Sequence, residues 1–108
     1  MTQLQAMTLS IALEVPVVLA LCGLSLRATM AGAAATLLTH PIIWWAFYAL
    51  QPHLGWTARA ALLEGAVVLV EAAVYRWTLD LSPRKALGVS ALANTVSFGV
   101  GLLLQTVT

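Results

Sequence analysis

Four long apolar stretches, separated by short polar segments, account for nearly the whole chain. They cover about 4–26, 29–50, 57–79 and 84–107. A helix rises ~1.5 Å per residue, so about 20 residues cross the ~30 Å hydrocarbon core of a bilayer. The breaks contain Pro, Gly and charged residues, which are typical of turns. The pattern predicts an all-α integral membrane protein: a bundle of four transmembrane helices with short loops, in a single membrane domain over 1–108.

The composition supports this class. Hydrophobic residues make up 61% of the chain and charged residues only 8%, whereas soluble domains carry roughly 25% charged residues. The net charge of +1 offers no basic patch, so we expect no nucleic-acid partner. The first stretch has no Lys or Arg before it and is longer than the apolar core of a signal peptide. We therefore expect it to be a retained span.

The distribution of basic residues predicts an orientation. Arg27, Arg76, Arg84 and Lys85 flank the first and third breaks, and Arg59 lies beside the second. Lys and Arg favour cytoplasmic loops. The sequence therefore predicts cytoplasmic first and third turns, with the N-terminus and C-terminus outside, in a multi-pass protein of the cytoplasmic (inner) membrane.

Acidic residues within the apolar stretches are the first candidates for function. Glu64 and Glu71 lie seven residues apart in the third stretch, close to two helical turns, so they share a face. Glu14 lies near the middle of the first stretch. A carboxyl group inside a bilayer is costly and by default marks a functional site or a structural pair.

The second and fourth stretches supply polar groups at a similar depth. His40 lies about halfway along the second stretch, on the face of Thr36. The fourth stretch carries a helical stripe of polar and small residues: Ser90, Asn94, Ser97, Gly101 and Gln105. In lipid such a stripe turns toward other helices or a wet cavity.

All four stretches thus contribute to one predicted site for a substrate or ion, made of Glu14, His40, Glu64, Glu71, Asn94 and Ser97. Several carboxylates in one cavity cannot all stay charged unless some are protonated or a cation sits among them. A set of one His and three Glu suits a divalent metal ion such as Zn, Mn or Fe, with Glu14, His40, Glu64 and Glu71 as ligands. The same set suits a proton relay. No Glu-x-x-His pair of a di-metal bundle occurs.

The chain resembles the small multidrug resistance transporters in its length, its four spans and the acid of its first span, within Ala12-Leu13-Glu14-Val15. That likeness implies four helices and a membrane carrier with a first-span acid, here Glu14. It covers a small part of the chain. The third span departs from that family, whose third span is rich in aromatic residues and glycine, because it carries Glu64 and Glu71 instead. The sequence is therefore not assigned to the family.

A cation transporter or channel, coupled to a divalent metal ion or to protons, is the predicted function. A membrane-embedded metal-dependent enzyme using the same residues is one alternative, and an accessory or assembly subunit of a membrane complex is another. Beyond the lipid bilayer, the expected partners are a second copy of the chain or another membrane subunit. Glu14 and Arg27 recur as Glu71 and Arg84 at the same spacing, so an internal repeat of helix hairpins, 1–50 and 57–107, is a further hypothesis.

Overall fold

The computed structural model describes residues 2–107, with side chains described as far as Leu104. Its described part is all-α, as predicted, and contains four helices: α1 (Gln3–Cys22), α2 (Leu26–Ala49), α3 (Trp56–Leu79) and α4 (Pro83–Val107). The predicted stretches and the observed helices differ by a few residues at their ends.

Local capping interactions explain where the helices begin and end. The Ser25 hydroxyl accepts a hydrogen bond from the Ala28 N–H at the start of α2, and the Ser82 hydroxyl accepts one from the Lys85 N–H at the start of α4. The chain leaves α1 at Gly23, whose φ of 98° favours glycine. It leaves α3 at Asp80 in the left-handed conformation. These short caps make two tight hairpins, α1–α2 and α3–α4.

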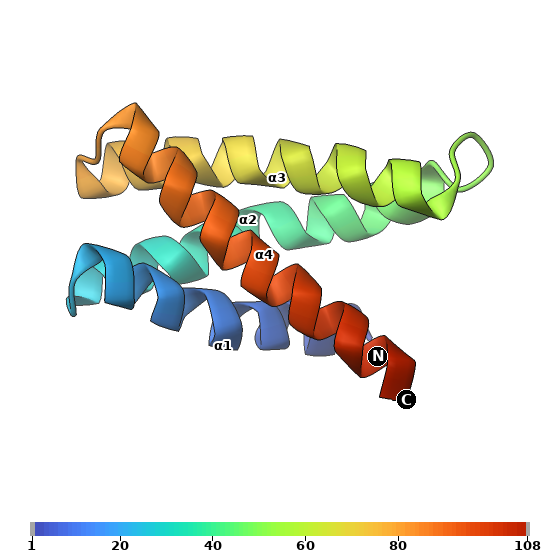
Figure 1. Ribbon diagram of the computed structural model, residues 1–108, viewed down its shortest axis with the longest axis horizontal. Helices are drawn as coiled ribbons and strands as arrows, with labels where there is room; N and C mark the ends of the chain where they lie inside the picture. The colour runs from blue at the N-terminus through green and yellow to red at the C-terminus, as the bar shows by residue number, and fades with distance from the viewer. Residues whose placement is uncertain (1, 108) are drawn as a thin grey trace.

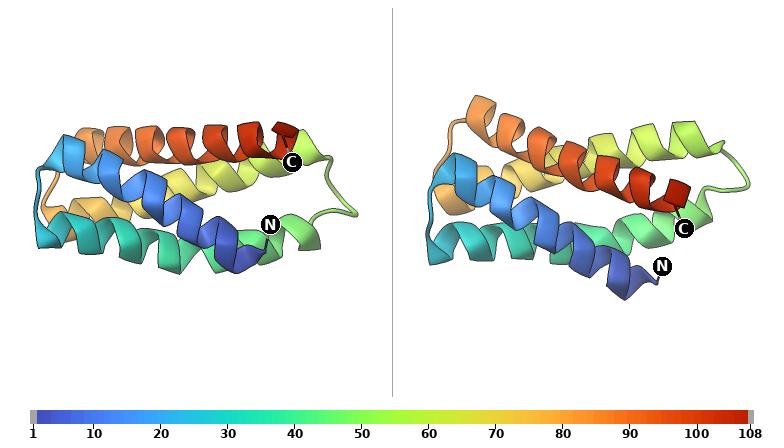
Figure 2. Two further views of the ribbon diagram at one scale, coloured as in Figure 1. Left: turned by 90° about the horizontal axis from the view of Figure 1, so that it is seen from below. Right: turned by 60° about the horizontal axis from the view of Figure 1, so that its bottom comes forward.

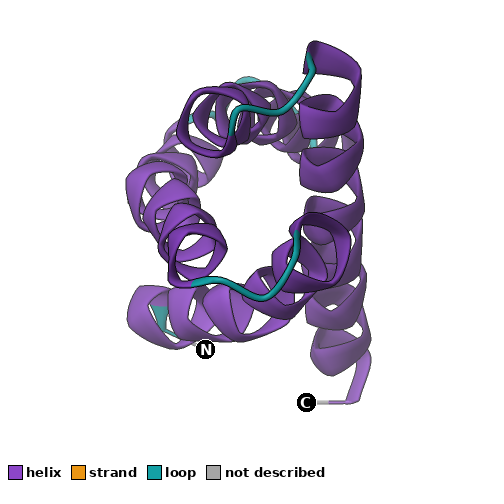
Figure 3. Cartoon of the chain, turned by 90° about the vertical axis from the view of Figure 1, so that its left-hand side faces the viewer, coloured by secondary structure: helices purple, strands orange, loops and turns teal. Residues whose placement is uncertain are grey.

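The four helices pack side by side around a shared interior. Each helix contacts the next one along the chain, and α1 also packs against α4 (Figure 3). The two hairpin turns lie at one end of the molecule, and the α2–α3 loop lies with both termini at the other (Figures 1 and 2). We call these the turn end and the terminal end. The turn end therefore carries Arg27, Arg76, Arg84 and Lys85 at the ends of its helices, as the sequence predicted.

Three of the helices are long and apolar enough to cross a membrane: α1, α2 and the Pro83–Leu104 part of α4. Helix α3 is as long, but its four charged residues exclude it by the same measure. The outer surface exposes many large apolar side chains, including Leu24, Trp45 and Trp77. Large exposed apolar surfaces are rare on soluble monomers. These findings support a membrane protein.

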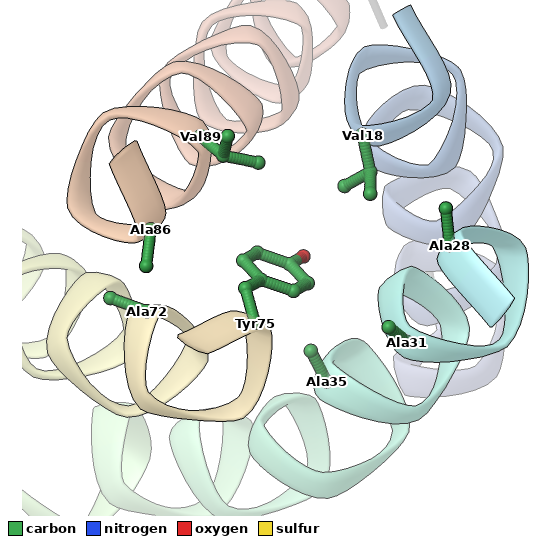
Figure 4. Close-up of a cluster of buried hydrophobic side chains, with 8 residues drawn as sticks. All are labelled: Val18, Ala28, Ala31, Ala35, Ala72, Tyr75, Ala86 and Val89. Atoms are coloured by element: carbon green, nitrogen blue, oxygen red, sulfur yellow. The ribbon is translucent and has the colours of Figure 1, made fainter. Parts of the chain in front are cut away.

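The apolar core lies toward the turn end. There the ring of Tyr75 is fully buried and projects between the helices, among small side chains from all four (Figure 4). Its neighbours are Val18, Ala28, Ala31, Ala35, Ala72, Ala86 and Val89. Small side chains let helix backbones approach closely and leave room for one aromatic ring.

Gly32 provides a test of the α1–α2 contact. A Cβ atom there would lie 3.2 Å from Val15 Cγ2, whereas a Cβ at Gly88 would meet nothing within 4 Å. We expect Gly32→Leu to lower the free energy of unfolding by about 1–3 kcal/mol through overpacking. Gly88→Leu should leave it unchanged or raise it by up to ~1 kcal/mol through helix propensity. Denaturant titration in detergent measures both, and equal effects would contradict the close α1–α2 approach.

Candidate functional site

The carboxyl group of Glu71 lies at the centre of the buried polar residues. Glu71 is on α3 and is 1% exposed. Thr39 Oγ1 of α2 donates a hydrogen bond to its Oε2 atom at 2.8 Å, and Asn94 Nδ2 of α4 donates one to its Oε1 atom at 2.8 Å. One carboxyl group thus connects three helices.

Glu14 brings the fourth helix into the same cluster. It lies on α1, is 3% exposed, and accepts a long hydrogen bond of 3.5 Å from Thr36 Oγ1 of α2 at its Oε2 atom. Its Oε1 atom is buried and has no hydrogen-bond partner. The charge of Glu71 also acts on the Glu14 carboxyl group. We call Glu14 and Glu71 the carboxyl pair.

The helices around the carboxyl pair fix the groups that contact it. Besides its bond to Glu71, Thr39 Oγ1 lies 2.9 Å from the Ala35 carbonyl oxygen of its own helix. Asn94 Nδ2 also donates to the Ser90 carbonyl oxygen at 2.9 Å. Ser90 Oγ in turn donates to the Val68 carbonyl oxygen of α3 at 2.7 Å. These bonds hold the donors of the carboxyl pair on rigid helices rather than on loops.

The structure brings three of the six predicted site residues together, namely Glu14, Glu71 and Asn94. Glu64 is half-buried and lines a groove of about 550 Å³ between α3 and α4, which Asn94 also lines. No hydrogen bond joins Glu64 to the carboxyl pair in the described part of the chain, although the Glu71 charge acts on Glu64. Glu64 therefore lies beside the site rather than in it.

His40 and Ser97 make other contacts. His40 Nδ1 lies 3.3 Å from Gln3 Nε2 of α1, and its ring stacks on Trp44 with 6.0 Å between ring centroids. Ser97 Oγ donates to Ser10 Oγ at 3.1 Å, which links α4 to α1. Among residues 2–107, no group of three or more His, Cys, Asp or Glu side chains is gathered to hold a metal ion. The side chain of Gln105, the last residue of the predicted stripe, lies outside the described side chains.

Two features of the interior were not predicted. Thr39 is a direct partner of Glu71, and the only sequence signal for it is its place three residues after Thr36 on a helix. Arg59 is buried near the terminal end, where its Nη1 donates to the Phe47 carbonyl oxygen at 2.8 Å and its guanidinium lies 4.1 Å from the Phe47 ring centroid. A cation at the last carbonyls of α2 also suits the helix dipole. Arg59 therefore joins α2 to α3.

The Asn94 amide gives a test of the hydrogen bonds around the carboxyl pair. Asn94→Leu leaves Glu71 Oε1 without its donor in a buried site, and an unsatisfied buried polar group costs about 1–3 kcal/mol. We expect the free energy of unfolding to fall by that amount in denaturant titrations. Thr95→Val is the matched control, because Thr95 is exposed on the next position of the same helix and bonds only to the Ala91 carbonyl oxygen. If both variants unfold alike, Asn94 does not satisfy Glu71.

Removing the Tyr75 hydroxyl should have the opposite effect on stability to removing the Asn94 amide. This hydroxyl is buried and has no hydrogen-bond partner. Removing an unsatisfied polar group while keeping the ring should be neutral or stabilising by up to about 1–3 kcal/mol. We expect Tyr75→Phe to keep or raise the thermal unfolding temperature, and Tyr75→Ala to lower it strongly because it leaves a cavity. Loss of stability in Tyr75→Phe would contradict an unpartnered hydroxyl group.

Comparison with known proteins does not identify a family for the chain. No protein-family model, no curated protein and no solved structure is significantly similar to the chain. What the carboxyl pair does must therefore be argued from its own contacts.

Proposed function

We propose that the chain is a multi-pass protein of the cytoplasmic membrane in which all four helices cross the bilayer. The length of α3 and the burial of its polar groups support this, because Glu71 and Arg59 face the protein interior and not the lipid. The four basic residues of the turn end support a cytoplasmic location for that end, with both termini outside. In this arrangement the carboxyl pair lies within the membrane.

We infer that the carboxyl pair binds and releases a proton. The observation that carries this inference is the contact of Thr39 Oγ1 with two acceptors, Glu71 Oε2 at 2.8 Å and the Ala35 carbonyl oxygen at 2.9 Å. A hydroxyl group has one hydrogen to donate. If Glu71 Oε2 takes up a proton, the direction of its bond with Thr39 reverses. The carboxylic acid then donates to Thr39, and Thr39 donates only to the Ala35 carbonyl oxygen. The nearby Glu14 also opposes a second negative charge.

The protein would act as a small proton-coupled cation transporter. Thr39 and Asn94 hold the Glu71 carboxyl group in place, and Glu14, with one unpartnered oxygen, is the group through which a proton or substrate cation would enter the pair. Burying a neutralised pair in a low-dielectric interior costs far less free energy than burying two carboxylates. A homodimer would supply the enclosed volume that four helices lack.

A divalent metal ion is the second candidate ligand, favoured by one observation. Glu14 and Glu71 place two carboxyl groups, which are oxygen donors, on two different helices, beside the Asn94 amide of a third helix. Such oxygen donors suit Mg or Mn better than Zn. His40 would not take part, since it contacts Gln3. A metal-dependent enzyme would use the same carboxyl groups to hold its metal ion. An accessory subunit would use these bonds only to fix helix pairing.

Proton transport into vesicles tests the proposal. In proteoliposomes loaded with a pH-sensitive dye, we expect the intact chain to carry protons down an imposed gradient, and Glu14→Gln and Glu71→Gln to fall to the rate of protein-free vesicles. The amide oxygen that Glu71→Gln introduces would still accept from Asn94, so the fold should be kept. Asp80→Asn is the matched control, because Asp80 lies outside the site and asparagine also adopts its left-handed conformation.

Three outcomes separate the alternatives. Transport lost in both glutamine variants but not in Asp80→Asn supports the carboxyl pair. Stoichiometric metal in the purified protein, absent from both variants, would replace the proton by a metal ion. Full transport by both variants, or none by the intact chain, would leave the pair a structural device and contradict the proposal.

A further inference from the structure

A second recess lies away from the carboxyl pair, between α2 and α3 at the turn end. It has a volume of about 370 Å³ and is lined by Arg27, Met30, Ala31, Ala34 and Thr78. The Thr78 hydroxyl donates to the Val74 carbonyl oxygen of its own helix, so it is already satisfied. The recess is thus an apolar groove with one cation, Arg27, at its end.

The position of that cation is unusual for a helix. Arg27 lies in the first turn of α2, which contains no acidic residue, and Arg84 and Lys85 lie in the first turn of α4. The N-terminus of a helix carries partial positive charge, so cations are disfavoured there and anions are favoured. The C-termini of α1 and α3 lie at the same end, so the four helix dipoles largely offset one another there. The excess positive charge of the turn end comes from its side chains, with Arg27, Arg76, Arg84 and Lys85 against the single acid Asp80.

We propose that this groove binds an anionic phospholipid. The lipid phosphate would contact the Arg27 guanidinium at the start of α2, and an acyl chain would lie along Met30, Ala31 and Ala34 toward the membrane centre. The inference rests on the membrane location proposed above, but not on proton transport by the carboxyl pair.

The shape of the site selects this ligand class. Basic pockets between transmembrane helices on the cytoplasmic side bind anionic headgroups. A soluble phosphate would use the charge but leave the apolar floor uncovered, and a zwitterionic lipid would use the floor but bring a second positive charge to a cationic end. The exposed Trp77 on α3, 74% accessible, marks the same level as a membrane interface.

Thermal unfolding of the whole protein in detergent, with added lipid, tests the site. We expect phosphatidylglycerol to raise the unfolding temperature and phosphatidylcholine to raise it much less. Arg27→Gln should weaken the apparent affinity for phosphatidylglycerol about fivefold, from the ~1 kcal/mol of one basic residue at a lipid headgroup. Ala34→Phe should weaken it as well, because the ring fills the groove without changing the charge. Arg76→Gln is the matched control, since it removes one cation of the turn end that does not line the groove.

The arms of the experiment distinguish the alternatives. Equal loss in Arg76→Gln and Arg27→Gln would mean diffuse attraction and overturn the proposal. So would full binding by Ala34→Phe, or an equal shift with glycerol phosphate, which has the phosphate but no acyl chain. Circular dichroism of each variant without lipid confirms that it is folded. Glu14→Gln should bind the lipid normally, so loss of transport and loss of lipid binding are separate results.

Discussion

The hydrogen bonding of one buried carboxyl group constrains the whole arrangement of helices. Glu71 has no exposure to solvent that could stabilise it, so its oxygens must find donors inside the protein. It finds them on α2 and α4, from Thr39 and Asn94, and it faces Glu14 of α1. Rotating α3 by a fraction of a turn would break these contacts together. The position of each helix therefore depends on the others through this group.

The small side chains of the turn end make that network geometrically feasible. Gly32 lets α1 approach α2 closely, and Thr36, one turn further, then reaches Glu14. The alanines around Tyr75 bring the same helices together on the turn-end side of the carboxyl pair. Apolar packing alone would not select one rotation of each helix, since lipid is as apolar as the core. Small residues set the distances between helices, and the polar contacts set their rotation.

The fold and part of the site follow from the sequence, for physical reasons that also explain the failures. Apolar length and Pro or Gly breaks predict the four helices, and the cost of burying an acid predicts that Glu14 and Glu71 meet. Depth along a helix does not fix the rotation of the helix, however. His40 and Glu64 therefore have suitable depth, but His40 contacts Gln3 and Glu64 lines the groove between α3 and α4. The contact of Thr39 with Glu71 could not be predicted from the sequence, because a threonine in a helix usually bonds to the backbone of its own helix. Arg59 near a helix end is expected in water, and its burial depends on the Phe47 carbonyl, which no pattern reveals.

Helix α3 depends on its neighbours more than the other three helices do. Helices α1, α2 and α4 are apolar enough to cross a membrane alone, whereas α3 carries Arg59, Glu64, Glu71 and Arg76. Two of these are buried against partners supplied by α2 and α4, and Arg76 lies exposed in the last turn. If α3 crosses a membrane as proposed, the cost of placing it in lipid would be offset by bonds that exist only in the assembled protein. The acid that makes α3 a poor span alone is the group that specifies its place among the other helices.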